Sequence, residues 1–129
     1  MKKILLDTHI LIWLAGGVKV GPQTLRLIQD ADVVLVSALS ILELRIKYST
    51  GKLPEVEKII ASIKTMEFEI LDLTHTHTES YQIFNPLNKD PYDNALLSTA
   101  LVESIALVTA DQGILSVKRK GLELINAKK

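Results

Sequence analysis

Apolar residues in this chain follow two alternating patterns. Short continuous apolar runs at residues 3–6, 33–36 and 106–109 are typical of strands that are covered on both faces, as in a parallel sheet. The segments between them carry apolar residues three or four positions apart, which is typical of helices with one buried face. Strands that alternate with helices favour an α/β fold with right-handed crossovers.

The pattern predicts a definite order of elements. Strands are expected over residues 3–6, 33–36, 69–73, 106–109 and 122–125, and helices over 9–15, from Pro22 to about 30, 38–48, from Pro54 onward, 74–84, 91 to about 105, and 114–117. Ser37 and Asp90 are the expected helix caps, and a proline opens three of the helices. We therefore expect one domain over residues 1–129, a three-layer α/β/α fold with a parallel sheet of four or five strands.

Composition narrows the classes of protein to which the chain can belong. Of its 129 residues, 47% are hydrophobic and 23% are charged, as in ordinary globular proteins. Fifteen basic and fifteen acidic residues cancel, so any nucleic-acid binding must depend on local patches. There is no cysteine, no apolar run of about 20 residues, and Asp7 interrupts the first apolar run. We expect a cytoplasmic protein without membrane contact.

Acidic residues stand where such a fold places its ligands. Asp7 ends the first strand, Asp111 follows the fourth, Asp93 lies in the first turn of a helix, and Glu43 lies inside the helix after the second strand. Open parallel sheets bind ligands beyond the carboxyl ends of their strands. These four acids are therefore candidates for one site.

Two of these acids also have a purely structural interpretation. Asp7 can cap the helix that follows it. Asp93 can interact favourably with the positive end of its own helix. Because Asp90 suits the capping position of that helix better, Asp93 remains available for a site.

Glu43 is the most informative acid. It lies on a helix face with Leu39 and Ile46 as neighbours, where an unpaired carboxylate is costly to bury. A cation must therefore meet it. The candidates are Lys47, one helical turn later, and a bound divalent cation shared with other acids.

Four stretches in order resemble the PIN-domain ribonucleases of the VapC toxin type. They are LLDTHILIW (residues 5–13), VSALSILELRIKYSTGKL (36–53), DPYDNALLSTAL (90–101) and LVTADQGI (107–114). The resemblance covers nearly the whole chain. It implies that the core metal-binding acids are Asp7, Glu43 and Asp93, that Asp111 is the fourth acid, and that the flanking hydroxyl positions are Thr8, Ser40 and Thr109.

Two positions depart from the commoner pattern of that family. Asn88 stands where a histidine is usual before the Asp-Pro motif, and Asn94 stands where an arginine often follows the acid. Neither position carries a metal-binding acid. The departure therefore concerns contacts to RNA and leaves metal binding intact.

The resemblance implies an endoribonuclease that uses Mg²⁺ or Mn²⁺, and oxygen-rich ligand sets do favour such hard cations. It further implies an RNA substrate, a small antitoxin protein that silences the cleft with a basic side chain, and a homodimer. The alternatives are a PIN-like module that binds RNA or a partner without cleaving, and a receiver-type signalling domain. The receiver is a poorer match because it needs an acidic pair after its first strand.

Several other residues invite a functional role. His75 and His77 are two positions apart and do not share a helix face, which argues against a metal pair. His9 follows the first acid and is a candidate for the cleft wall, whereas Trp13 is expected in the core or an interface. The basic run at residues 118–120 is expected to be solvated. The apolar segment 9–15 and the stripe of Ile59, Ile60 and Ile63 suggest surface for a second chain.

Overall fold

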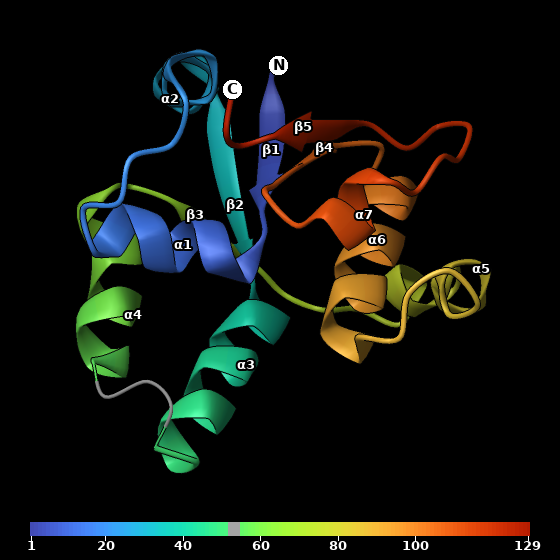
Figure 1. Cartoon of the computed structure of the whole chain (residues 1–129), viewed down its shortest axis with the longest axis horizontal. Coiled ribbons are helices and arrows are strands. Elements are labelled where there is room, and N and C mark those ends of the chain that lie inside the picture. Colours follow the sequence, from blue (N-terminus) through green and yellow to red (C-terminus); the bar gives the residue numbers. More distant parts are fainter. Residues whose placement is uncertain (52–54) are drawn as a thin grey trace.

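The computed structural model describes residues 1–51 and 55–129, and in it helices cover both faces of one central sheet (Figure 1). The elements are β1 Lys3–Leu6, α1 Thr8–Ala15, α2 Pro22–Asp30, β2 Val33–Ser37, α3 Ala38–Ser49, α4 Val56–Thr65, β3 Glu69–Leu71, the 3-10 helix η1 Thr76–Thr78, α5 Tyr81–Phe84, α6 Pro91–Glu103, β4 Ala106–Thr109, α7 Gln112–Leu115 and β5 Leu124–Asn126.

The sheet has five strands in the order β3-β2-β1-β4-β5, and every neighbouring pair is parallel. The first strand lies in the middle, so the chain builds outward from it in both directions. Strands β1 and β4 are therefore neighbours from opposite halves of the topology. A crevice opens beyond the carboxyl ends of two such strands, because the helices that follow them go to opposite faces.

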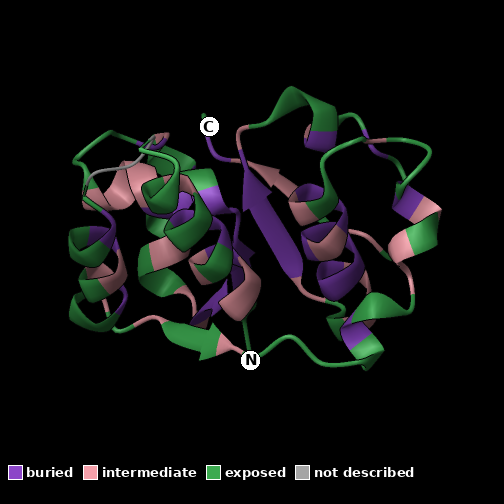
Figure 2. Cartoon of the chain, turned by 90° about the horizontal axis from the view of Figure 1, so that it is seen from below, coloured by how far each residue is buried: buried purple, intermediate pink, exposed green. Residues whose placement is uncertain are grey.

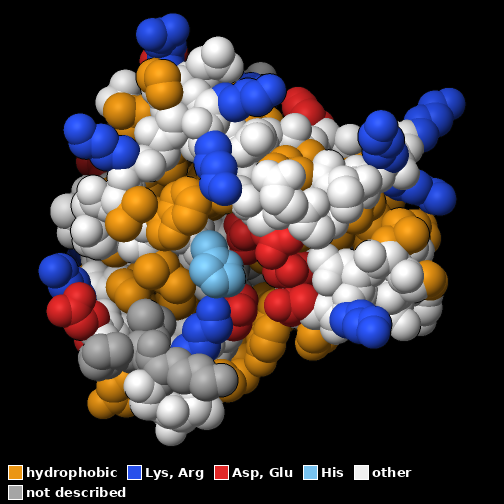
Figure 3. All heavy atoms as spheres, in the orientation of Figure 1, with side chains coloured by type: hydrophobic (Ala, Val, Ile, Leu, Met, Phe, Trp, Pro, Cys, Tyr) orange, Lys and Arg blue, Asp and Glu red, His pale blue; other side chains and the backbone are white. Residues whose placement is uncertain are grey.

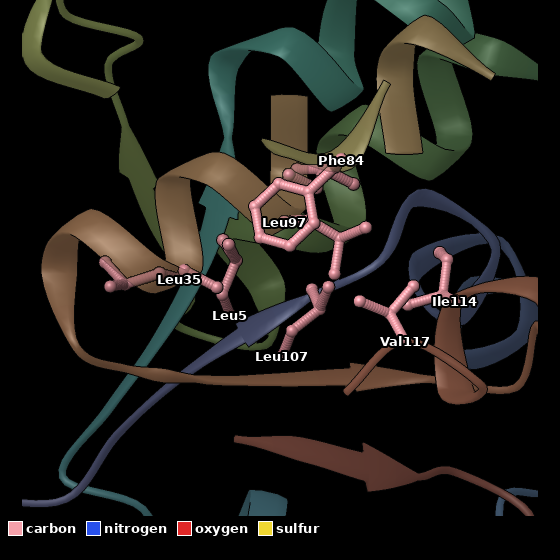
Figure 4. Close-up of a cluster of buried hydrophobic side chains, with 9 residues drawn as sticks. Leu5, Leu35, Phe84, Leu97, Leu107, Ile114 and Val117 are labelled. Atoms are coloured by element: carbon pink, nitrogen blue, oxygen red, sulfur yellow. The ribbon is translucent and has the colours of Figure 1, made fainter. Parts of the chain in front are cut away.

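Alternation along the strands divides the core into two sides. Leu5, Leu35 and Leu107 face the side that α5, α6 and α7 cover, where Phe84 and Leu97 complete the cluster (Figure 4). The residues on either side of them face the opposite layer, most of them toward α1 and α2 and Val36 toward α1, α3 and α4. Buried strands between two partly exposed helical layers are visible in Figure 2. The expected three-layer α/β/α fold is confirmed, with five strands.

Most predicted elements are present, with shifted ends. The third strand stops at Leu71, the fifth is Leu124–Asn126, and the last short helix is Gln112–Leu115, which starts directly after Asp111. The predicted start of a helix at Pro54 lies outside the described residues, and α4 is described from Val56. Ser37 and Asp90 cap their helices as expected, since each side chain accepts a backbone N–H of the first turn.

The predicted helix over 74–84 is wrong, because polar groups there find partners outside a helix. The buried His77 accepts the Thr74 N–H at Nδ1 (3.0 Å), and its Nε2 lies 2.7 Å from an oxygen of Glu103 on α6. The Ser80 N–H donates to the hydroxyl of Ser98, also on α6. The segment therefore forms η1 and α5, and His77 ties the start of this segment to α6.

The apolar segment 9–15 is largely covered by the chain itself. Ile10 and Leu11 are fully buried, and the α4 residues Ile59 and Ile63 are at most 5% exposed. Exposed apolar side chains are found instead on α3, among them Leu42, and at scattered positions elsewhere, such as Leu25 on α2 and Ile70 on β3. Among the described residues, no helix has the length and hydrophobicity that crossing a bilayer requires.

Candidate functional site

Asp7 lies at the carboxyl end of the central strand β1 and directly before α1. It is 2% exposed, and its side chain makes no capping hydrogen bond to α1. Instead, the Thr109 hydroxyl at the end of β4 donates to Asp7 Oδ2 at 2.8 Å. The simple capping interpretation of this carboxylate is therefore wrong, and the side chain is turned toward the crevice between β1 and β4.

Thr109 connects two of the four acids. Its hydroxyl oxygen also accepts the backbone N–H of Asp111 at 3.1 Å. Asp111 in turn accepts the Ile114 N–H at 3.0 Å and so caps α7. A side chain on Gly113 would begin 2.9 Å from this carboxylate, which explains the glycine here. Asp111 is exposed and held at the rim of the crevice.

Glu43 reaches the same crevice from α3. It is 7% exposed, and its Oε2 lies 3.4 Å from Nζ of Lys47 one turn along the helix. The ion pair with Lys47 is thus present. It supplies one cation and leaves the other two buried carboxylates, Asp7 and Asp93, without an ion-pair partner among the described residues.

Asp93 enters from the first turn of α6, where Asp90 occupies the capping position. Asp90 Oδ1 accepts the N–H groups of Tyr92 and of Asp93, so the Asp93 carboxylate is not used for capping. Burial raises the pKa of Asp93 to about 7, and neighbouring negative charges add to this effect. In order of effect, those charges are Asp90, Asp7, Asp111 and Glu43.

The pKa of Asp7 is raised as well, chiefly because burial penalises its charged form. The hydrogen bond from Thr109 and the nearby His9 oppose that rise, whereas Glu43 adds to it. Two buried carboxyls with raised pKa values, each affected by the other acids, mean that the crevice gathers negative charge. Figure 3 shows acidic side chains grouped in a hollow beside a histidine.

Hydroxyl and amide groups support the acids from behind. The buried Thr8 hydroxyl donates to Ser40 Oγ at 2.9 Å and so ties α1 to α3 next to the site. Asn94 is fully buried and donates from Nδ2 to the Asn88 carbonyl at 2.7 Å. The two asparagines that depart from the family pattern therefore hold the loop before α6 onto the helix.

Within residues 1–51 and 55–129, no three His, Asp or Glu side chains stand close enough together to hold one metal ion as they are. Carboxylates repel one another when no cation lies between them, and Glu43 is paired with Lys47. The donors themselves are carboxylate oxygens, which suit Mg²⁺ or Mn²⁺. The residues present therefore fit a hard divalent cation that would draw them together.

A pocket of about 210 Å³ adjoins the acids. It is lined by Asp7, His9, Trp13, Ala110, Asp111 and Lys128. His9 thus lines the crevice, and Trp13 is half-buried, packing against core residues while also facing the pocket. Lys128 does not belong to any motif in the sequence, so it was not predicted as a residue of the site.

Comparisons with known proteins place the fold. The solved structures it resembles include DNA-bound VapBC from Salmonella typhimurium (TM-score 0.71, 20% identity, 98% of both chains covered). Also similar are VapBC2 from Rickettsia felis bound to a promoter DNA fragment (TM-score 0.70, 20% identity, 96% of this chain and 98% of that chain) and VapBC-5 from Mycobacterium tuberculosis (TM-score 0.70, 14% identity, 98% of this chain and 99% of that chain).

Sequence comparison gives the family directly. No curated protein sequence matches the chain. The model of the PIN domain, however, matches residues 4–120, a span that begins in β1 and includes all four acids. By fold and by this match, the chain belongs to the PIN domain family.

Proposed function

We propose that this protein is a divalent-metal-dependent endoribonuclease whose site consists of Asp7, Glu43, Asp93 and Asp111. The observation that carries the proposal is that these four acids, from β1, α3, α6 and the end of β4, lie close enough for burial to raise the pKa of Asp93 to about 7 and for the charges of Asp7, Asp111 and Glu43 to add to that rise. Membership of the PIN domain family supports the same chemistry. Folding brings this negative charge together at a cost, which a ligand of opposite charge would remove.

Asp7, Glu43 and Asp93 are the residues that would hold Mg²⁺ or Mn²⁺, with Asp111 at the rim. When bound, such a cation supplies positive charge and Lewis acidity for the hydrolysis of a phosphodiester bond. Thr109 orients the Asp7 carboxylate through its hydroxyl, and Ser40 and Thr8 fix α3 against α1. The chain thus provides an oxygen-rich wall beside which the reacting phosphate would lie.

Cleavage of RNA with and without divalent metal tests the proposal. We expect cleavage with Mg²⁺ or Mn²⁺, none with chelator, and a nearly inactive but folded Glu43→Gln variant. Glu57→Gln is the matched control, because Glu57 pairs with Arg45 on the exposed surface, away from the crevice. If Glu43→Gln keeps full activity per folded molecule, the proposed site is wrong.

The same assay distinguishes the nuclease from the remaining alternative, which is a PIN-like module that binds RNA or a protein and does not cleave RNA. Calorimetry with Mn²⁺ on the wild type and on Asp93→Asn supplies an independent test of the site. Equal affinity in both proteins would remove Asp93 from the metal-binding set. Metal binding without any RNA cleavage would support the non-cleaving module.

We further propose that the protein is the toxin of a toxin–antitoxin pair in the cytoplasm. Its structural relatives include a protein described as a member of the VapBC family of toxin–antitoxin systems. The crevice suits a small antitoxin that places an arginine or lysine against the acids, where a charge-assisted hydrogen bond would replace the cation. Co-expression with the adjacent small reading frame should silence the nuclease, and growth inhibition unchanged by that partner would contradict this proposal.

We also propose that the protein forms a homodimer, through exposed apolar side chains on α3. Leu42, Ile46 and Tyr48 are 42–53% exposed on that helix. Light scattering at micromolar concentration tests the assembly. A monodisperse monomer would contradict it.

A further inference from the structure

Beside the acidic crevice, one pocket combines aromatic, basic and acidic side chains. We propose that this pocket binds a single nucleoside of the RNA substrate, next to the phosphate that is cleaved. The inference rests on the proposed ribonuclease function and adds to it a subsite in which Trp13 and Lys128 are positioning residues. Trp13 thereby gains a role in binding, whereas the sequence alone predicted it to lie in the core or in an interface.

The geometry of α1 joins the pocket to the site. His9 and Trp13 are four residues apart and lie on the same face of the helix, which begins directly after Asp7. Asp7 and Asp111 line the pocket and also belong to the acidic cluster. A ligand in this pocket is therefore continuous with whatever lies at the carboxylates.

Trp13 offers a fixed aromatic surface. The residue packs against the buried cluster that includes Ile4, Leu6 and Ile10, so part of its ring system is anchored in the core. The rest lines the pocket. An aromatic side chain that is already held in place loses little entropy when a base stacks on it, and unpaired RNA bases are commonly recognised in this way.

Lys128 adds a positive charge to the lining of the pocket. It follows β5, its side chain is exposed, and its backbone N–H donates to Asn126 Oδ1 at 3.0 Å. A flexible lysine beside an aromatic surface is the combination that binds a phosphate next to a stacked base. A nucleotide strand supplies both a base and a phosphate to such a pocket, whereas a bare metal ion would leave Trp13 unused.

The size of the pocket limits the ligand to one base. Its volume of about 210 Å³ is below the roughly 300–1,000 Å³ that is usual for drug-sized ligands. Other pockets of the described chain, of about 300, 400 and 440 Å³, include none of the four acids. Of these four pockets, the one that Asp7 and Asp111 line therefore suits a base next to the reacting phosphate.

Fluorescence tests occupancy directly, because Trp13 is the single tryptophan of the sequence. An Asp93→Asn variant keeps the RNA intact and leaves every pocket-lining residue unchanged. Titration of this variant with a short single-stranded oligoribonucleotide in Mg²⁺ should quench the indole fluorescence, since a base stacks on the ring. An abasic oligomer of the same length, with the same phosphates, should not.

Steady-state cleavage tests what the pocket contributes. Trp13→Leu keeps an apolar side chain against the core and loses the aromatic face, so KM should rise about tenfold while kcat changes much less. Trp13→Phe should restore KM. Lys128→Ala should raise KM, with the larger effect at low salt. Lys129→Ala is the matched control, because Lys129 is an equally exposed neighbour that does not line the pocket.

The outcomes separate this inference from the proposed function. Cleavage by the wild type with no quenching and with KM unchanged in Trp13→Leu and Lys128→Ala overturns the subsite and leaves the nuclease intact. Quenching without cleavage overturns the nuclease and leaves a nucleotide-binding pocket. Quenching by an antitoxin peptide but not by RNA overturns the subsite, since the pocket then belongs to the protein partner.

Discussion

The acids of the crevice are held in two different ways, according to whether a strand or a helix carries them. Asp7 and Asp111 follow β1 and β4, and the Thr109 hydroxyl connects them through hydrogen bonds of 2.8 and 3.1 Å. Glu43 and Asp93 project from α3 and α6. Glu43 has only the ion pair with Lys47. Among the described residues, no side-chain hydrogen bond to the Asp93 carboxylate is present.

This difference shows which acids are destabilised by burial and by repulsion between negative charges. The buried Asp7 has a donor that offsets the burial of its charge, because the Thr109 hydrogen bond opposes the rise of the Asp7 pKa. Burial raises the pKa of the helix-borne Asp93 to about 7, and neighbouring negative charges add to this rise. The strands therefore provide a prearranged half of the site, and the helices provide a half that is completed by a ligand.

The largest effect is expected from Asp93→Asn. Removing one charge from the uncompensated half should lower metal-dependent cleavage at least about 100-fold, since losing even an indirect partner of a metal commonly costs 10- to 100-fold. The same change relieves repulsion, so the metal-free protein should become more stable. Urea denaturation with chelator checks the second expectation. A variant that loses both activity and stability would show that Asp93 is structural.

Thr109→Val should remove the hydrogen bond that holds the Asp7 carboxylate in the strand-borne half of the site. The substitution keeps the shape of the side chain and removes the donor to Asp7, so the pKa of Asp7 should rise further. Because a buried acceptor loses its partner, we expect a stability loss of about 1–3 kcal/mol in addition to a 10- to 100-fold loss of activity.

Thr99→Val is the matched control for that experiment. Thr99 is equally buried, but its hydroxyl donates to the Ala95 carbonyl within α6, away from the acids. It should lose some stability and little activity. If both variants lose activity equally, the Thr109 hydrogen bond has no special role.

Much of the strand-borne half could be predicted from the sequence. Continuous apolar runs fixed β1, β2 and β4, and general topology places an acid after such a strand at the ligand edge. Asp90 was predicted as a cap because Pro91 follows it, and the structure agrees. These features depend on residues within a few positions of one another.

The remainder depends on contacts between distant residues, which a single sequence does not reveal. The helix predicted over 74–84 failed because His77 bonds to Glu103, 26 residues away. Lys128 reaches the pocket through the pairing of β5 with β4, more than a hundred residues after Asp7. The ion pair of Glu43 with Lys47, in contrast, spans one turn and was predicted as one of two alternatives.

Stability of the metal-free protein should decrease as pH rises through the range set by Asp93. Its pKa is about 7 in the folded chain against 3.8 for the ordinary carboxyl, so between these values the folded state holds a proton that the unfolded state has released. Stability from this group is complete below about pH 3.8 and is lost as pH approaches 7. Asp7, whose pKa is also raised, contributes with the same sign.

Urea denaturation at a series of pH values, in the presence of chelator, measures how the free energy of unfolding depends on pH. Asp93→Asn should flatten this dependence, and saturating Mg²⁺ should reverse the loss near neutral pH because only the folded state binds the ion. A slope that is unchanged in Asp93→Asn would assign the effect to Asp7 or to groups outside the crevice.

The smallest effect is expected from Lys47→Met, which removes the only cation that meets an acid of the helix-borne half among the described residues. An exposed i,i+4 pair stabilises a helix by about 0.2–0.5 kcal/mol, but Glu43 is buried and loses its only cation, so the free energy of unfolding of the metal-free protein should fall by more than that. Affinity for Mn²⁺ should rise a few-fold, because Glu43 no longer has a competing partner. Arg45→Met is the control on the same helix, since it breaks the exposed 2.9 Å pair with Glu57 and should change stability by at most about 1 kcal/mol without any effect on Mn²⁺ affinity. A fall in Mn²⁺ affinity in Lys47→Met would mean that Lys47 holds Glu43 in position for the metal, and the helix-borne half would then be as prearranged as the strand-borne one.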